Sequence, residues 1–158
     1  MRGRVSQALL DNLATAWSRL DQARPLDPAD VSALMAALDE WVRWAVRIDR
    51  ELLAVLGSEF AAGRRSLPGG QPLPGLHLAA DLVARTGHPI DALVTVSAGA
   101  PALFYDVVWK RYEELPSSEL RAEGVEAYRL HLAGQAARRP ASEVTTFLLG
   151  AAVAGVVR

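Results

Sequence analysis

Residues 31–55 read VSALMAALDEWVRWAVRIDRELLAV, and their apolar side chains recur at spacings that alternate between three and four. The apolar positions are, in order, Val31, Leu34, Leu38, Trp41, Ala45, Ile48, Leu52 and Val55. A repeat that averages 3.5 residues places all its members on one face of an α-helix. The stretch therefore predicts a long helix whose apolar seam packs against other helices in a bundle.

The other face of this predicted helix is charged. It carries Asp39, Glu40, Arg43, Arg47, Arg50 and Glu51. Two of the possible pairs, Asp39 with Arg43 and Arg47 with Glu51, are four residues apart, and opposite charges at this spacing support an exposed helix modestly. We interpret this face as solvated surface and not as a binding site.

A shorter helix is predicted before the seam, over residues 5–23. Pro25 ends it, because proline disfavours helical geometry in the residue before it, and Asp27 followed by Pro28 is a favourable start for the next helix. If the seam helix runs to about residue 60, it is about 50 Å long and its partner only about 30 Å, at 1.5 Å per residue. The second half of the seam must therefore be covered by later helices or by another chain.

Residues 63–75 read GRRSLPGGQPLPG, which is too rich in glycine and proline for a helix or a strand. Loops of this length are uncommon inside compact domains and are usually functional or disordered. We predict a disordered segment or a plain connector, in either case dispensable for folding. It would divide a single all-helical domain, residues 1–158, into a helical hairpin, residues 1–62, and a helical cluster, residues 76–158.

The cluster is predicted to contain several short helices. The first spans about residues 76–86 and is closed by Gly87, a residue that commonly ends helices. Residues 93–97 read LVTVS and have strand propensity, but no convincing second strand is evident, so a short helix is expected. A further helix is predicted over residues 101–115, because its aromatic residues recur at helical spacing. Another is predicted from about residue 117 to residue 138. The fold class expected is all-α, a bundle of five to seven helices with the N-terminal antiparallel hairpin packed on the C-terminal cluster.

The last predicted helix begins near Ser142 and contains the run FLLGAAVAGVV, residues 147–157. A helix that is apolar on all sides is usually buried on all sides. We expect it to form the centre of the bundle or to be covered by a partner. The predicted interaction surface is formed by Leu148, Leu149, Val153, Val156 and Trp44.

Composition narrows the possible functions. A chain of 158 residues fits one domain, and a net charge of −1 provides no attraction to nucleic acid or anionic lipid. The absence of cysteine excludes disulfides, thiolate zinc sites and thiol nucleophiles. Polar residues interrupt the N-terminus too early for a signal peptide, and the apolar run near the C-terminus is shorter than the roughly 18–20 residues of a membrane span. We predict a cytoplasmic protein without nucleic-acid or membrane partners.

One group of residues could support chemistry. His77 and Asp81 are one helical turn apart, and His88 and Asp91 occupy the following turn, so imidazoles and carboxylates could converge as acid and base or around a small molecule. The aromatic residues Tyr105 and Trp109 of the predicted helix 101–115 could form the other wall of such a pocket.

Sequence signatures of helical metalloenzymes and nucleotide-binding enzymes are missing. Glu123 and Glu126 form a single ExxE motif without a second acidic pair, and the chain has no Glu-x-x-His pair, HExxH, P-loop, GxSxG or dinucleotide-binding motif. We therefore predict no metal and no cofactor.

We favour a non-enzymatic interaction module, either an oligomeric scaffold or an accessory subunit that docks on a larger protein. A dimer is the default, since two-fold dimers are the commonest homo-oligomers. The alternative is a small-molecule or catalytic site between helix 101–115 and the region from His77 to Asp91. A flat exposed apolar patch would favour the first hypothesis, and a deep pocket bordered by His88 and Tyr105 the second.

Overall fold

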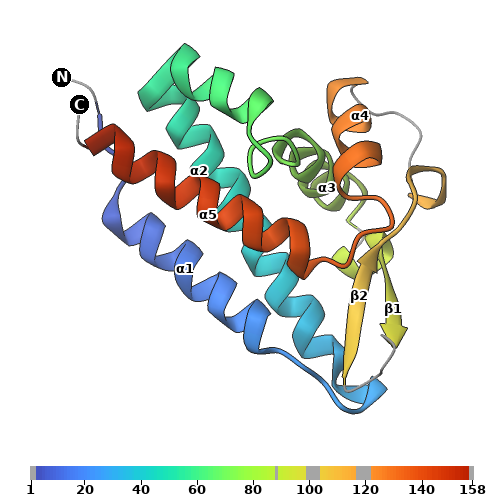
Figure 1. Ribbon diagram of the computed structural model, residues 1–158. Coiled ribbons are helices and arrows are strands. Elements are labelled where there is room, and N and C mark those ends of the chain that lie inside the picture. Colours follow the sequence, from blue (N-terminus) through green and yellow to red (C-terminus); the bar gives the residue numbers. More distant parts are fainter. Residues whose placement is uncertain (1–2, 88, 99–103, 117–121, 157–158) are drawn as a thin grey trace.

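The computed structural model describes residues 3–87, 89–98, 104–116 and 122–156 (Figure 1). Five α-helices dominate this part of the chain: α1 (Gln7–Gln22), α2 (Val31–Ser66), α3 (Leu73–Thr86), α4 (Ala122–His131) and α5 (Arg138–Val156). The strands β1 (Val94–Ala98) and β2 (Tyr105–Trp109) form a small antiparallel sheet, and the 3-10 turns η1 (Pro28–Asp30), η2 (Ile90–Leu93) and η3 (Tyr112–Glu114) lie between elements. The chain is predominantly helical, which confirms the predicted fold class.

The seam of α2 forms the centre of the core. From Val31 to Leu52 every seam residue is buried, and only Val55 is half-exposed. α1 and α5 lie side by side along α2 (Figure 1), and both extend to the end of the seam near Leu52 and Val55. The indole Nε1 of Trp41 donates a hydrogen bond of 2.9 Å to Oγ1 of Thr145, which joins α2 to α5 inside the core.

Within α2 the chain reverses direction at Gly57. This residue has φ 60° and ψ −134°, a conformation that glycine adopts without the strain of a Cβ atom. Asp49 and Arg64 would be about 22 Å apart along a straight helix, at 1.5 Å per residue, but their side chains are in contact. The end of α2 therefore folds back along its own helix (Figure 1), and we call residues 58–66 the distal arm.

The prediction of a 13-residue connector over 63–75 is wrong. The flanking helices continue into both ends of it and leave only residues 67–72 between them. Gly69 is buried in this turn, where an added Cβ would overlap the carbonyl oxygen of Glu143 and lie 2.5 Å from Cβ of Phe147. Its glycines permit close packing against α5, so the segment is part of the core.

The short helix predicted at 93–97 and the helix predicted at 101–115 are also wrong. β1 and β2 pair in antiparallel register, with Thr95 opposite Val108. Residue 108 also bridges to Ala136, which covers the other edge of β2. β-branched residues on both strands favour this pairing, and the aromatic spacing of the second strand only resembled a helical face. Residues 101–103 lie outside the described part of the chain.

α3 and α4 cross in close contact because each presents a glycine at the crossing. A Cβ added to Gly75 would lie 2.9 Å from the backbone of Tyr128, and one added to Gly124 would lie 3.1 Å from Cβ of Leu78. The described part of α4 is shorter than the helix predicted over 117–138, whose residues 117–121 lie outside the description. This crossing places Gly124 of α4 against Pro74 and Leu78 of α3.

α5 begins at Arg138, before the predicted start at Ser142. The guanidinium of Arg138 donates hydrogen bonds to the carbonyl oxygens of Leu20, Asp21 and Ala23 at the end of α1. The first alternative for the last helix, a position at the centre of the bundle, is wrong, because α5 crosses the surface of the bundle and Val153 is 64% exposed. The second alternative, cover by a partner, stays a prediction. In the described residues, no helix combines the length and apolar character that crossing a membrane requires.

Candidate functional site

Asp49 is a fully buried carboxylate next to the apolar seam of α2. Its Oδ2 lies 2.8 Å from Nη2 of Arg64 and 2.6 Å from Nε2 of His77. The side chains of Arg64 and His77 are 16% and 22% exposed. The distal arm brings Arg64 to this point and the first turns of α3 bring His77, so three segments meet in what we call the buried charge cluster.

Burying the charge cluster costs free energy, and not all of its polar atoms form hydrogen bonds. Removing charged groups from water costs several kcal/mol per ion, and mutual attraction repays this only where all polar atoms find partners. Oδ1 of Asp49 and Nε of Arg64 are buried without a hydrogen-bond partner among the described residues. Buried polar groups in proteins are normally paired, and exceptions concentrate at functional sites. A buried ion pair of this kind is therefore weak evidence for a contribution to fold stability.

The contact with Asp49 determines which nitrogen of His77 remains available. An ionised carboxylate only accepts hydrogen bonds, so the imidazole Nε2 that faces Asp49 carries the proton. In the neutral imidazole, Nδ1 is then the acceptor, and it can take a hydrogen bond or a proton from a bound molecule.

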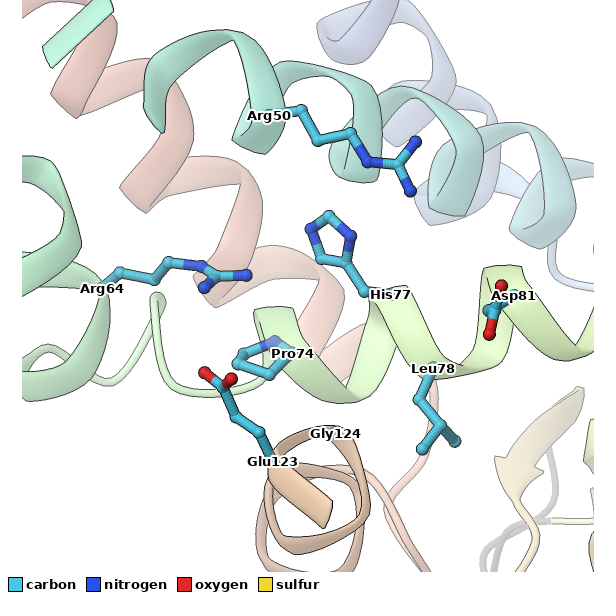
Figure 2. Close-up of a pocket in the computed structure, with 8 residues that line it drawn as sticks. All are labelled: Arg50, Arg64, Pro74, His77, Leu78, Asp81, Glu123 and Gly124. Atoms are coloured by element: carbon cyan, nitrogen blue, oxygen red, sulfur yellow. The ribbon is translucent and has the colours of Figure 1, made fainter. Parts of the chain in front are cut away.

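A cavity of about 330 Å³ adjoins the cluster (Figure 2). We call it the polar cavity. Its lining residues are Arg50, Arg64, Pro74, His77, Leu78, Asp81, Glu123 and Gly124. Figure 2 shows the two guanidinium groups reaching it from α2 on either side of the His77 ring, with Glu123 on α4 and Asp81 further along α3. Helices α2, α3 and α4 thus each supply charged groups to one space.

The charges on the cavity wall differ in how far they are already neutralised. Asp81 forms a 2.9 Å ion pair with Arg85, and Arg64 is held by Asp49. Arg50 and Glu123 are exposed, and neither forms an ion pair with another described residue. Among the charged residues that line the cavity, Arg50 and Glu123 are therefore the ones whose charges are free to pair with a ligand.

The first turn of α3 also borders the cavity, since Pro74 belongs to it. The N-terminus of an α-helix carries a partial positive charge that favours anions. This partial charge adds to the positive charge of the two arginines. Neither the cavity nor any other part of the described chain contains a group of three or more His, Asp or Glu side chains arranged to hold a metal ion.

The structure brings two of the six predicted pocket residues to the polar cavity, His77 and Asp81, although they do not pair with each other. Asp91 is exposed in η2, and the amide of Tyr105 in β2 donates to the carbonyl of Pro25. His88 lies outside the described residues. The cavity is therefore on the α2 side of α3, away from the sheet that replaces the predicted aromatic helix.

Trp109, the sixth predicted pocket residue, is buried in the core beside Tyr128, with ring centroids 6.3 Å apart. Burial, with a smaller contribution from the charge of Glu114, raises the pKa of the Tyr128 hydroxyl. That hydroxyl stays protonated and donates a 2.6 Å hydrogen bond to the carbonyl of Lys110. These two aromatic residues have a structural role.

Sequence reasoning missed the residues that complete the cavity. Asp49 had a signal, since a carboxylate directly after the seam residue Ile48 lies at the edge of the buried face. Arg50 was assigned to a solvated face, and Arg64 to a connector. Glu123 was considered only as half of an ExxE motif.

The predicted interaction surface is divided by the structure. Leu148 is fully buried, while Trp44 and Leu149 are half-buried and Val153 is exposed. The side chain of Val156 is not described. Close to Leu149 in sequence, Phe147 stacks on Phe60 of the distal arm, and a groove of about 160 Å³ opens beside them. We call it the apolar groove; Leu56, Gly63, Ala151 and Gly155 also line it.

No family model matches the chain, and no curated protein or solved structure matches it with statistical significance. The class of protein is therefore described by its own structure, as a small helical bundle with a charged cavity between three of its helices.

Proposed function

We propose that the protein binds a small molecule bearing an oxyanion, a carboxylate or a phosphate, in the polar cavity. The observation that carries this proposal is the buried carboxylate of Asp49, which holds Arg64 and His77 in fixed positions at the cavity wall. Arginine binds carboxylate and phosphate oxygens through paired N–H donors. Ligand-binding groups are most effective when other residues fix them in advance.

Binding is a better match to this site than covalent catalysis. The eight lining residues within the described part of the chain include no serine, threonine, tyrosine or cysteine that could act as a nucleophile. His77 can accept a proton through Nδ1, but this single property does not define a reaction. The site supplies cations and hydrogen-bond partners, which are the requirements of recognition.

Titration calorimetry with inorganic phosphate and with acetate tests the proposal. We expect saturable binding of at least one of these anions at a single site. Arg50→Gln should weaken it at least about tenfold, since a hydrogen bond to a charged group contributes about 1.5–3 kcal/mol. Arg50 is exposed, so this variant should keep the melting temperature of the wild type.

Arg47→Gln is the matched control. Arg47 lies one turn earlier on α2, is also exposed and packs over the ring of Trp44 without lining the cavity. Its replacement should leave anion affinity unchanged. Absence of saturable binding by either anion, or equal loss in both variants, would contradict an anion site in the cavity.

A second proposed function is docking of a protein, or of another copy of the chain, on α5. The exposed Val153 and the apolar groove support it. The second half of the seam gives this proposal no support, because other parts of the same chain cover it. Light scattering tests self-association, with Val153→Asp expected to shift any dimer to monomer without changing the circular dichroism. Wild-type protein that stays monomeric at high micromolar concentration would argue against a dimer.

A further inference from the structure

Groups of opposite charge line the polar cavity. Arg50 and Arg64 come from α2, whereas the carboxylates of Asp81 and Glu123 come from α3 and α4. Figure 2 shows Glu123 beside Pro74, below the guanidinium group of Arg64 in this view, and Asp81 further along α3. An anion bound to the arginines therefore lies in a space that also holds two carboxylates.

A plain anion leaves these carboxylates without a function and is repelled by them. Glu123 has no ion-pair partner among the described residues, so its charge is not cancelled, and that of Asp81 is only partly offset by Arg85 at an exposed position. Like charges at short range disfavour binding, and a cation placed between them removes that penalty. A ligand with its own cationic group can pair with a carboxylate of the cavity as well as with the arginines.

We propose that the ligand is a small zwitterion, with an oxyanion bound by Arg50 and Arg64 and an ammonium group bound by Glu123. This inference rests on the proposed function and specifies its ligand class. Carboxylates bind ammonium groups more strongly than neutral hydroxyls, because both partners are charged. A cavity of about 330 Å³ is at the small end of ligand sites, which suits an amino acid or an aminoalkyl phosphate.

Pairs of probes that differ only in the amine test this inference by calorimetry. For the phosphate form they are phosphoethanolamine and ethyl phosphate, and for the carboxylate form γ-aminobutyrate and butyrate. The amine-bearing member of one pair should bind at least about tenfold more tightly, as expected for charged hydrogen bonds. The pair that shows the preference identifies the oxyanion.

Glu123→Gln should reduce this preference to near unity, while the affinity for the amine-free probe stays the same or rises. Glu126→Gln is the matched control, since Glu126 is exposed one turn along α4 and does not line the cavity. It should preserve the preference.

The outcomes separate the two proposals. Equal binding within both pairs would overturn the zwitterion and leave the anion site intact. Glycerol 3-phosphate binding as tightly as phosphoethanolamine would also overturn it, because a hydroxyl would then suffice. Failure of all probes, inorganic phosphate and acetate included, would reject the anion site together with the zwitterion.

Discussion

Two buried regions of α2 lie within three turns of each other and differ in chemistry. Around Trp41 the surroundings are apolar, and the one polar atom of the indole is paired with Thr145. Around Asp49 the neighbours are an arginine and a histidine, and one carboxylate oxygen has no partner in the described structure. Burial stabilises the first region and costs free energy in the second. The comparison shows that equal burial on one helix can maintain the fold at one position and prepare a binding site at another.

The largest effect is expected from truncating the apolar region. Leu38→Ala removes a fully buried side chain and should lower the free energy of unfolding by about 2–5 kcal/mol, through lost burial and the cavity left behind. A denaturant titration measures this. Leu130→Ala, at an exposed position on α4, is the control and should have little effect. A loss below about 0.5 kcal/mol for Leu38→Ala, the size of a typical surface effect, would show that the seam does not carry the core.

The charged region should respond differently to single and double changes. Asp49→Asn leaves Arg64 and His77 without their counter-charge and should cost about 2–4 kcal/mol, somewhat less than for a fully enclosed pair because both partners are partly exposed.

Combining Asp49→Leu with Arg64→Met should return the free energy of unfolding to within about 1 kcal/mol of the wild type, because apolar replacement of a buried ion pair is often neutral. Anion binding should be lost in this double variant. If the double variant is as unstable as Asp49→Asn, the cluster supports the fold itself, and the contrast with the Trp41 region disappears.

A smaller effect is expected in the turn that joins the distal arm to α3. Gly69→Ala introduces a methyl group against Glu143 and Phe147 and should cost about 1–3 kcal/mol through overpacking. The melting temperature measures it. An unchanged melting temperature would show that this segment is a dispensable connector and not part of the core.

The smallest effect, of opposite sign, is expected at Gly150 in α5. A Cβ there meets no atom within 4 Å, so Gly150→Ala should raise the free energy of unfolding by about 0.5–1 kcal/mol through helix propensity. It serves as the matched control for Gly69→Ala in the same denaturation experiment. Destabilisation at Gly150 would indicate that this face of α5 is covered by another molecule.

The helices of the hairpin and the buried seam could be predicted because periodicity is local and α2 repeats it over many turns. The sheet could not, since Val94 to Ala98 needed a strand whose aromatic residues also fit a helical face. The cavity was harder still. Arg64 reaches Asp49 only because Gly57 reverses the chain, and no local pattern reveals a positive φ at a glycine in the middle of a helical segment. His77 was recognised by residue type alone, and its partner was misidentified.

The hydrogen bond between Trp41 and Thr145 has a consequence for protein synthesis. Its two residues are 104 positions apart, and at about 5–20 residues per second the ribosome adds the second roughly 5–20 seconds after the first. Throughout that interval the part of α2 that packs on α5 has no α5 to cover it. The nascent chain therefore exposes an apolar strip of α2 until α5 emerges, and this is the stage at which a chaperone would contact it.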